Sequence, residues 1–199
     1  MAITTGCAQQ PSKTSDPGVI INGIRWATRN VATPGTFADK PEDAGMFYQW
    51  NRKKAWNATD SIVVGWDTSM PEGDEWEKDN DPSPKGWRIP TMEEFASLCD
   101  EDKVNIEWTT QNSVKGMKFT DKANGNSIFL PAAIHRYPYD GQIPDVGTGG
   151  FYWSSTINEE YTTLAYHLFF MRGEINSGYT SATDGGTFIC GFSLRCVAE

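Results

Sequence analysis

Few side chains in this sequence are of the types that carry out chemistry. The chain has two histidines, His135 and His167, four cysteines, and no His-Glu-x-x-His motif, so a His-rich zinc site is not indicated. It also lacks the Gly-x-Ser-x-Gly, P-loop and Gly-x-Gly-x-x-Gly patterns that serve hydrolysis and nucleotide binding. We therefore predict a protein that is not an enzyme and uses no cofactor.

Carboxylates offer a second possible chemistry in the acidic segment 65–86. Calcium prefers oxygen ligands, and this segment contains the carboxylates of Asp67, Asp74, Asp79 and Asp81. Their spacing is not that of an EF-hand loop, and a solvated acidic loop explains them as well. We therefore predict no metal site here.

Composition limits the classes of partner. With 199 residues, a net charge of −9 and 8 Trp, 7 Tyr and 10 Phe, the chain can form one domain with a sizeable core. The basic cluster 52–54 is too short to bind nucleic acid, which needs many Lys and Arg side chains. No apolar run is long enough to span a membrane.

The first 18 residues have the composition of a tether, polar and with two prolines. Within them, the stretch 4–7, "TTGC", resembles the end of a bacterial lipoprotein signal, in which the cysteine is acylated. This predicts lipidation of Cys7 and a place at the cell surface or outer membrane, or secretion if Cys7 is not modified. The lipid would be the protein's contact with the membrane.

The rest, 19–199, is expected to form one α+β domain of short antiparallel strands. Asn22-Gly23 between apolar residues predicts a two-residue hairpin turn. Thr91 followed by Glu94 forms a capping box, which predicts a helix start with Met92, Phe95 and Leu98 facing inward. Glycine, asparagine and serine interrupt the apolar stretches of the last third, as between short strands.

The stretch 165–173, "AYHLFFMRG", is apolar on both faces if it forms a strand, because successive side chains point to opposite sides. One face would hold Tyr166, Leu168 and Phe170, and the other His167, Phe169 and Met171. A sheet that covers one core needs only one such face, so the second face requires an explanation.

Three segments, read together, resemble a known family: "GWRIPTMEEFASL" (86–98), "FYWSST" (151–156) and "GFSLRCV" (191–197). They resemble the Fibrobacter succinogenes major paralogous domain, common in secreted and surface proteins of Bacteroidetes, and the likeness runs from about Val19 to the C-terminus. That family is similar to the formylglycine-generating-enzyme branch of C-type-lectin-like folds. It is also similar to the variable proteins of diversity-generating retroelements.

The resemblance implies a C-type-lectin-like domain whose last third presents a ligand surface on a fixed framework. In related sequences the residues matching Tyr166, Leu168 and Phe170 are framework and face inward, which would leave His167, Phe169 and Met171 outside. Either a neighbouring loop, such as 136–150, covers these three, or they form an exposed recognition patch.

We favour the patch, because the flanking segments combine aromatic with small polar residues, as antibody-like paratopes do. The predicted ligand-binding residues are Glu159, Glu160, Tyr161, His167, Phe169, Met171, Arg172, Glu174, Asn176 and Tyr179.

The resemblance also raises two interpretations of the cysteines. The enzyme branch binds copper through a C-terminal cysteine pair, but Cys190 and Cys196 are spaced differently and lack the surrounding Ser-Cys-His context. C-type-lectin-like folds commonly tie a helix to the last strand, which suggests a disulfide between Cys99 and Cys196, with buried thiols as the alternative.

The expected function is therefore recognition of a protein or glycan by a monomeric surface domain, which retroelement diversification would vary. A structural or adhesin subunit, such as a pilus tip, is the alternative from another class, with the apolar strand as its assembly interface. A copper-dependent oxidase is a remote third.

Overall fold

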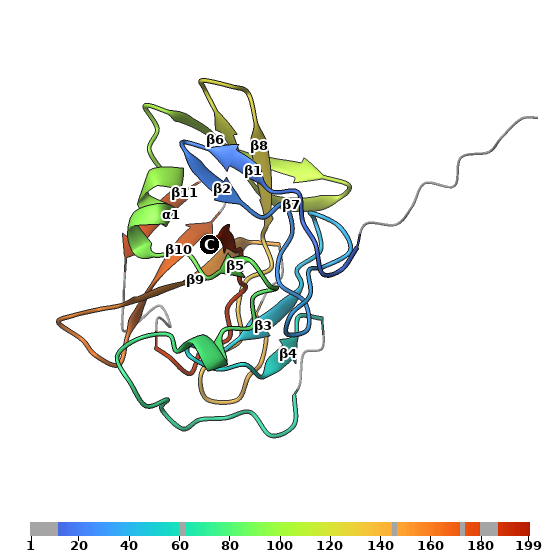
Figure 1. Ribbon diagram of the computed structural model, residues 1–199. Helices are drawn as coiled ribbons and strands as arrows, with labels where there is room; N and C mark the ends of the chain where they lie inside the picture. The colour runs from blue at the N-terminus through green and yellow to red at the C-terminus, as the bar shows by residue number, and fades with distance from the viewer. Residues whose placement is uncertain (1–11, 60–62, 145–146, 172–173, 180–186) are drawn as a thin grey trace, which may run out of the picture.

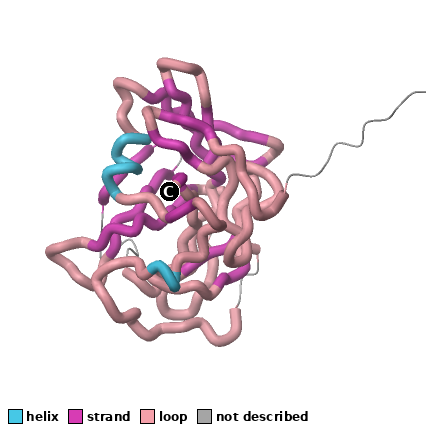
Figure 2. The backbone as a smooth tube through the Cα atoms, in the orientation of Figure 1, coloured by secondary structure: helices cyan, strands magenta, loops and turns pink. Residues whose placement is uncertain are grey.

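The structure is a computed structural model that describes residues 12–59, 63–144, 147–171, 174–179 and 187–199 (Figure 1). These residues form several small antiparallel sheets and one α-helix, connected by long loops (Figure 2). The predicted α+β class is confirmed in this coarse form, with β structure predominating.

Residues from both ends of the chain meet in a four-stranded sheet of order β1-β2-β12-β5. Its strands are β1 (Val19–Ile21), β2 (Ile24–Trp26), β12 (Val197–Ala198) and β5 (Trp87–Arg88). The β1–β2 turn has φ of 47° at Asn22 and 82° at Gly23, so the predicted hairpin is confirmed.

The predicted helix is α1 (Met92–Leu98), and its capping box is complete. The Thr91 hydroxyl accepts from the Glu94 backbone N–H at 3.3 Å, and the Glu94 carboxylate accepts from the Thr91 N–H at 2.8 Å. Phe95 and Leu98 are buried, as predicted for this face of the helix, whereas Met92 in the first turn is half-buried.

Helix α1 packs against a three-stranded sheet of order β11-β10-β9. Its strands are β9 (Gly149–Ile157), β10 (Ala165–Met171) and β11 (Glu174–Tyr179). A second three-stranded sheet is formed by β6 (Val104–Gln111), β7 (Val114–Asp121) and β8 (Ser127–Pro131), and β3 (Met46–Tyr48) pairs with β4 (Ala55–Asn57). The acidic segment 65–86 is irregular apart from the 3-10 turn η1 (Lys78–Asn80), and β5 begins directly after it.

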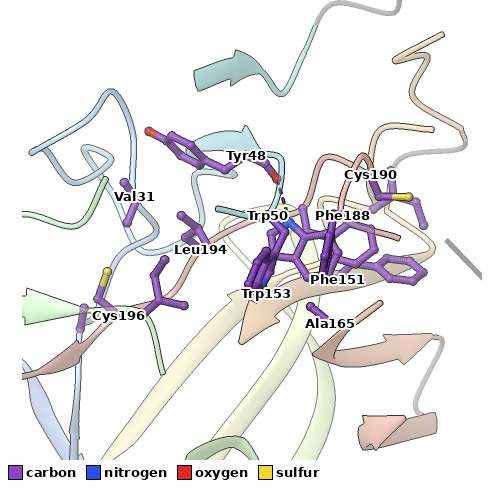
Figure 3. Close-up of a cluster of buried hydrophobic side chains, with 14 of the residues drawn as sticks. Val31, Tyr48, Trp50, Phe151, Trp153, Ala165, Phe188, Cys190, Leu194 and Cys196 are labelled. Atoms are coloured by element: carbon purple, nitrogen blue, oxygen red, sulfur yellow. Dashed lines mark hydrogen bonds between the residues drawn. The ribbon is translucent and has the colours of Figure 1, made fainter. Parts of the chain in front are cut away.

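The hydrophobic core lies on both sides of β9 and β10. On one side, Tyr152, Leu168 and Phe170 belong to a group of side chains under α1 and the β6-β7-β8 sheet, here called cluster 2. On the other side, Phe151 and Trp153 belong to a group built with the C-terminal segment 188–196, here called cluster 1 (Figure 3). Both faces of these two strands are therefore covered by protein.

Residues 12–18, which the sequence assigns to the tether, pack against the domain. The buried Asp16 carboxylate accepts from the Thr28 backbone N–H at 2.9 Å and the Thr28 hydroxyl at 2.8 Å, and pairs with Arg29 Nε at 3.0 Å. Burial raises the pKa of Asp16, but these hydrogen bonds and that from the Gly18 N–H outweigh it, so the pKa is below its usual value. The predicted lipidation site, Cys7, lies outside the described residues.

The structure does not contain the predicted disulfide between Cys99 and Cys196. Cys196 is buried in cluster 1, where its sulfur lies 3.2 Å from the hydroxyl oxygen of Ser83. Its neighbour Val197 packs in cluster 2, beside which Cys99 also lies. Because successive residues point to opposite sides, Cys196 faces away from the cluster that Cys99 borders. Burial raises the pKa of the Cys196 thiol to about 12.

Candidate ligand-binding surface

His167 does not lie on an open face of β10, as the sequence-based hypothesis required. Only 2% of its surface is exposed. Its ring packs edge-on to Phe192, with the centroids 5.1 Å apart, and lies 5.8 Å from that of Phe151. The aromatic side chains of cluster 1 therefore cover it, and no ligand reaches it without rearrangement of the core.

Phe169 is half-buried on the same side of the strand. Its ring lies 4.7 Å from that of Phe151 and packs against cluster 1. Met171, at the end of β10, is 38% exposed. Of the three side chains predicted to form an apolar patch, one is buried, one is half-buried and one is exposed, so the continuous patch does not form.

The covering residues come from two distant segments. Phe192 belongs to the C-terminal segment, and His135 precedes the loop 136–150, from which Ile143 packs against cluster 1. The His135 ring packs edge-on to Phe151 at 4.4 Å. Burial lowers the pKa of His135 to about 4, with a smaller contribution from the nearby His167. His167 is therefore covered, but by Phe151 of β9 and Phe192 of the C-terminal segment and not by the loop 136–150 that the sequence suggested.

The hairpin loop 158–164, which joins β9 to β10, is the part of the predicted surface that remains open. The buried Asn158 fixes it, because its side-chain oxygen accepts from the backbone N–H of Glu160 at 2.9 Å and of Tyr161 at 2.8 Å. The Asn158 N–H donates to Leu164 O at 2.9 Å, and the Leu164 N–H donates to Tyr161 O at 2.8 Å. A short loop with these bonds holds its exposed side chains in place.

Three predicted contact residues project from this loop. Tyr161 is 56% exposed, and Glu159 and Glu160 are exposed beside it. The loop also touches the C-terminal segment, because Leu164 pairs with Thr187 and the Phe188 N–H donates to Thr163 O at 3.4 Å. The loop therefore presents a phenol ring and two carboxylates on a supported base.

Most of the other predicted residues lie along β11, at the edge of the sheet. Arg172 is outside the described residues. The backbones of Glu174, Asn176 and Tyr179 lie in β11, where Glu174 pairs with Met171 and Tyr179 pairs with His167. Tyr179 is thus toward the end of the sheet where the hairpin loop lies, and Glu174 is at the opposite end. A single small ligand cannot contact both ends.

Sequence reasoning missed two features of the surface. Asn158 was not assigned a role, although an Asn at the first position of a loop is a signal for side-chain bonds to the following N–H groups. Tyr139, which is 83% exposed on the loop 136–150, was also not identified. No local pattern separates an exposed tyrosine from a buried one, so only the fold could reveal the second.

The two C-terminal cysteines, Cys190 and Cys196, were considered as a copper-binding pair. Cys190 and Cys196 lie at opposite ends of cluster 1, and burial raises the pKa of each thiol to about 12 (Figure 3). Among the described residues, no group of three or more His, Cys, Asp and Glu side chains is placed to hold a metal ion. The geometry of the two thiols therefore does not match that of a paired copper ligand.

No helix within the described parts of the chain combines the length and the apolar composition needed to cross a bilayer. Comparison of the sequence with protein-family models finds no match, nor does comparison with curated proteins or with solved structures.

Proposed function

We propose that this protein is a non-enzymatic recognition domain of C-type-lectin-like fold that binds a protein or glycan through the hairpin loop 158–164. In this proposal a lipid on Cys7 displays the domain at the cell surface. The buried strand β10 forms the frame, and the exposed loop forms the contact.

The observation that carries the proposal is the exposure of Tyr161 on a loop with a buried anchor. Tyrosine supplies a large contact area at a small cost in conformational entropy, which explains its enrichment in binding surfaces. The two hydrogen bonds that the Asn158 side chain accepts from loop N–H groups order the loop before a ligand arrives. A preordered loop retains more of the interaction energy as affinity.

The charge of the loop favours one kind of partner. Glu159 and Glu160 directly precede Tyr161, and the whole chain has a net charge of −9. A partner surface with lysine or arginine side chains would be attracted to this loop, and added salt would weaken that attraction. We therefore expect the association rate to fall as ionic strength rises.

Diversification of the last third by a retroelement is part of the proposal and is tested separately. The gene would be accompanied by a reverse transcriptase and by a near-copy of its 3′ end that differs mainly at adenines. If neither is present beside the gene, diversification is excluded, while ligand binding remains open to the experiment below.

Binding is tested on an array of glycans and surface proteins probed with the wild-type domain, Tyr161→Ala and Tyr139→Ala. Tyr139 is the matched control, because it is an exposed tyrosine on a different loop. We expect Tyr161→Ala to lose the wild-type signals and Tyr139→Ala to keep them. Equal signals from the wild type and Tyr161→Ala would contradict the proposed surface.

Light scattering on the same samples tests the assembly alternative. The recognition proposal predicts a monomer, because the apolar side chains of β10 are used within the fold. Stable oligomers that dissociate on Met171→Asp would instead support a structural subunit that assembles through the exposed end of the strand.

A further inference from the structure

A polar pocket of about 510 Å³ lies between the turn 49–54, which joins β3 to β4, and the segment 67–80. In Figure 1 the chain from 65 runs along the bottom of the molecule, beneath β3 and β4, and then rises through η1 toward β5. The size is in the range of small-molecule sites. None of the predicted ligand-binding residues lines it, so it is a separate site from the hairpin loop 158–164.

Two buried amide side chains fix the walls of this pocket. Gln49 donates to Asp67 O at 2.5 Å and to Ile189 O at 2.9 Å. Asn51 donates to Glu72 O at 3.1 Å and accepts from the Glu77 N–H at 2.9 Å. Because both amides hold the backbone of the segment 67–80, the wall is ordered without a ligand.

The pocket is lined by charges of both signs. The cations Arg52, Lys53 and Lys54 come from the turn, and the carboxylates Asp67, Glu72 and Glu77 come from the facing segment. Arg52 pairs with Asp67 and also donates to the Ser69 backbone and hydroxyl oxygens at 2.9 Å each.

The remaining charged groups are more open to a ligand. Lys53 Nζ makes one long contact, 3.4 Å from Asp79 O, and Lys53, Glu72 and Glu77 are exposed. They offer ammonium donors and carboxylate acceptors in one pocket.

This lining disfavours three classes of ligand. A strongly anionic ligand would face Glu72 and Glu77 in a chain of net charge −9. A strongly cationic ligand would face Lys53 and Lys54. An apolar ligand would find few partners, because Met70 and Pro71 are the apolar side chains among the described residues that line the pocket.

A neutral ligand with many hydroxyl groups would be repelled by neither set of charges and would not need apolar partners. Each hydroxyl donates one hydrogen bond and accepts up to two, so it can satisfy a carboxylate and an ammonium together. Hydrogen bonds to charged groups are stronger than those between neutral groups. Met70, which is partly exposed, offers a surface for the C–H face of such a ligand.

We propose that the pocket between the turn 49–54 and the segment 67–80 binds a neutral saccharide. Lys53 donates to its hydroxyl groups, and Glu72 and Glu77 accept from them. This site shares no residue with the hairpin loop 158–164. The proposal for the pocket and the proposal for the loop can therefore be tested independently.

The test is a titration of the ¹⁵N-labelled protein with three probes: a neutral mannotriose, an acidic trigalacturonate and a cationic chitosan trimer. We expect the mannotriose to shift the amide signals of residues 49–54 and 67–80, at concentrations up to about 10 mM, and the two charged probes to bind more weakly. No shift with any probe, or tighter binding of a charged one, would overturn the proposal.

Paired variants locate the site. Lys53→Ala with Glu72→Ala should weaken mannotriose binding about tenfold, because charge-assisted hydrogen bonds are lost. Lys78→Ala with Glu75→Ala is the control, since it makes the same charge changes at residues of the segment 67–80 that do not line the pocket. Equal weakening by both pairs, or by neither, would contradict this location. Tyr161→Ala should leave mannotriose binding unchanged.

Discussion

Strand β10 and the hairpin loop that leads into it are adjacent in sequence but differ in how their apolar side chains are used. In the strand, His167, Leu168 and Phe170 are buried, and both faces contact other parts of the chain. In the loop, Tyr161 is 56% exposed, while the buried Asn158 supports its backbone. The strand is thus part of the core, whereas the loop has side chains that are accessible to a ligand.

The comparison teaches that apolar composition alone does not locate a binding surface. The strand is the more apolar of the two, yet its second face is occupied by Phe151 and Phe192. What distinguishes the loop is an exposed aromatic side chain on a backbone held by a buried hydrogen-bonding group. Variants in the strand should therefore change stability, and variants of the exposed loop residues should change binding.

The largest expected effect is that of Phe170→Ala. Phe170 is fully buried in cluster 2, so its truncation leaves a cavity and should lower the free energy of unfolding by about 3–5 kcal/mol. Urea unfolding of the variant measures this, with Tyr161→Ala as the comparison, which we expect to stay within about 0.5 kcal/mol of wild type. Similar losses in both variants would remove the distinction between strand and loop.

A smaller effect is expected from pH, through His135, which helps to cover the strand. Its pKa in the folded protein is about 4, below the usual 6.5, so the unfolded state takes up a proton first as the pH falls. The free energy of unfolding should therefore keep its full value above pH 6.5 and fall as the pH decreases toward 4. At pH 5 it should be about 2 kcal/mol lower than at neutral pH.

Urea unfolding at pH 7 and pH 5 should show this loss in the wild type and not in His135→Phe. The buried carboxylates with lowered pKa values, such as Asp16, lose their contribution only at lower pH, so they do not obscure the difference. An equal loss in both proteins would show that His135 is not buried as described.

Asn158→Ala should lower the free energy of unfolding by about 1–2 kcal/mol, because two loop N–H groups lose their acceptor. Its more specific effect is local: hydrogen exchange at the amides of Glu160 and Tyr161 should become faster. Thr162→Ala, at an exposed position of the same loop, is the control and should leave that exchange unchanged. Unchanged exchange in Asn158→Ala would contradict the support of the loop by Asn158.

The smallest effect is expected at Met171, where the strand emerges. It is 38% exposed, so Met171→Ser should change the free energy of unfolding by less than about 0.5 kcal/mol. Thermal unfolding measures the change. A loss as large as that of Phe170→Ala would show that the strand end is covered by a part of the protein beyond the described residues.

Features that depend on neighbouring residues could be predicted from the sequence. The capping box at Thr91 and the turn at Asn22-Gly23 are of this kind, because backbone geometry and nearby side chains determine both. Within the candidate site, Tyr161, which was predicted to contact a ligand, is exposed, while its role in binding stays a prediction.

Features that depend on distant segments could not be predicted. The alternation in β10 shows that both faces are apolar, but not that Phe192 covers one of them. The polar composition of residues 12–18 indicated a tether, whereas the partners of Asp16 lie at Thr28 and Arg29. The disulfide that the resemblance implied is absent as well, because a resemblance does not tell that Cys196 packs in cluster 1, away from Cys99.

We propose that ligands contact the hairpin loop and not the face of β10. The most direct test is a hydrogen-exchange footprint of the domain with a ligand identified on the array. We predict slower exchange at the amides of 158–164 and of the adjoining residues Thr187 and Phe188, with no change around Phe169 and Met171. Protection centred on Phe169 and Met171, with the loop unaffected, would contradict the account.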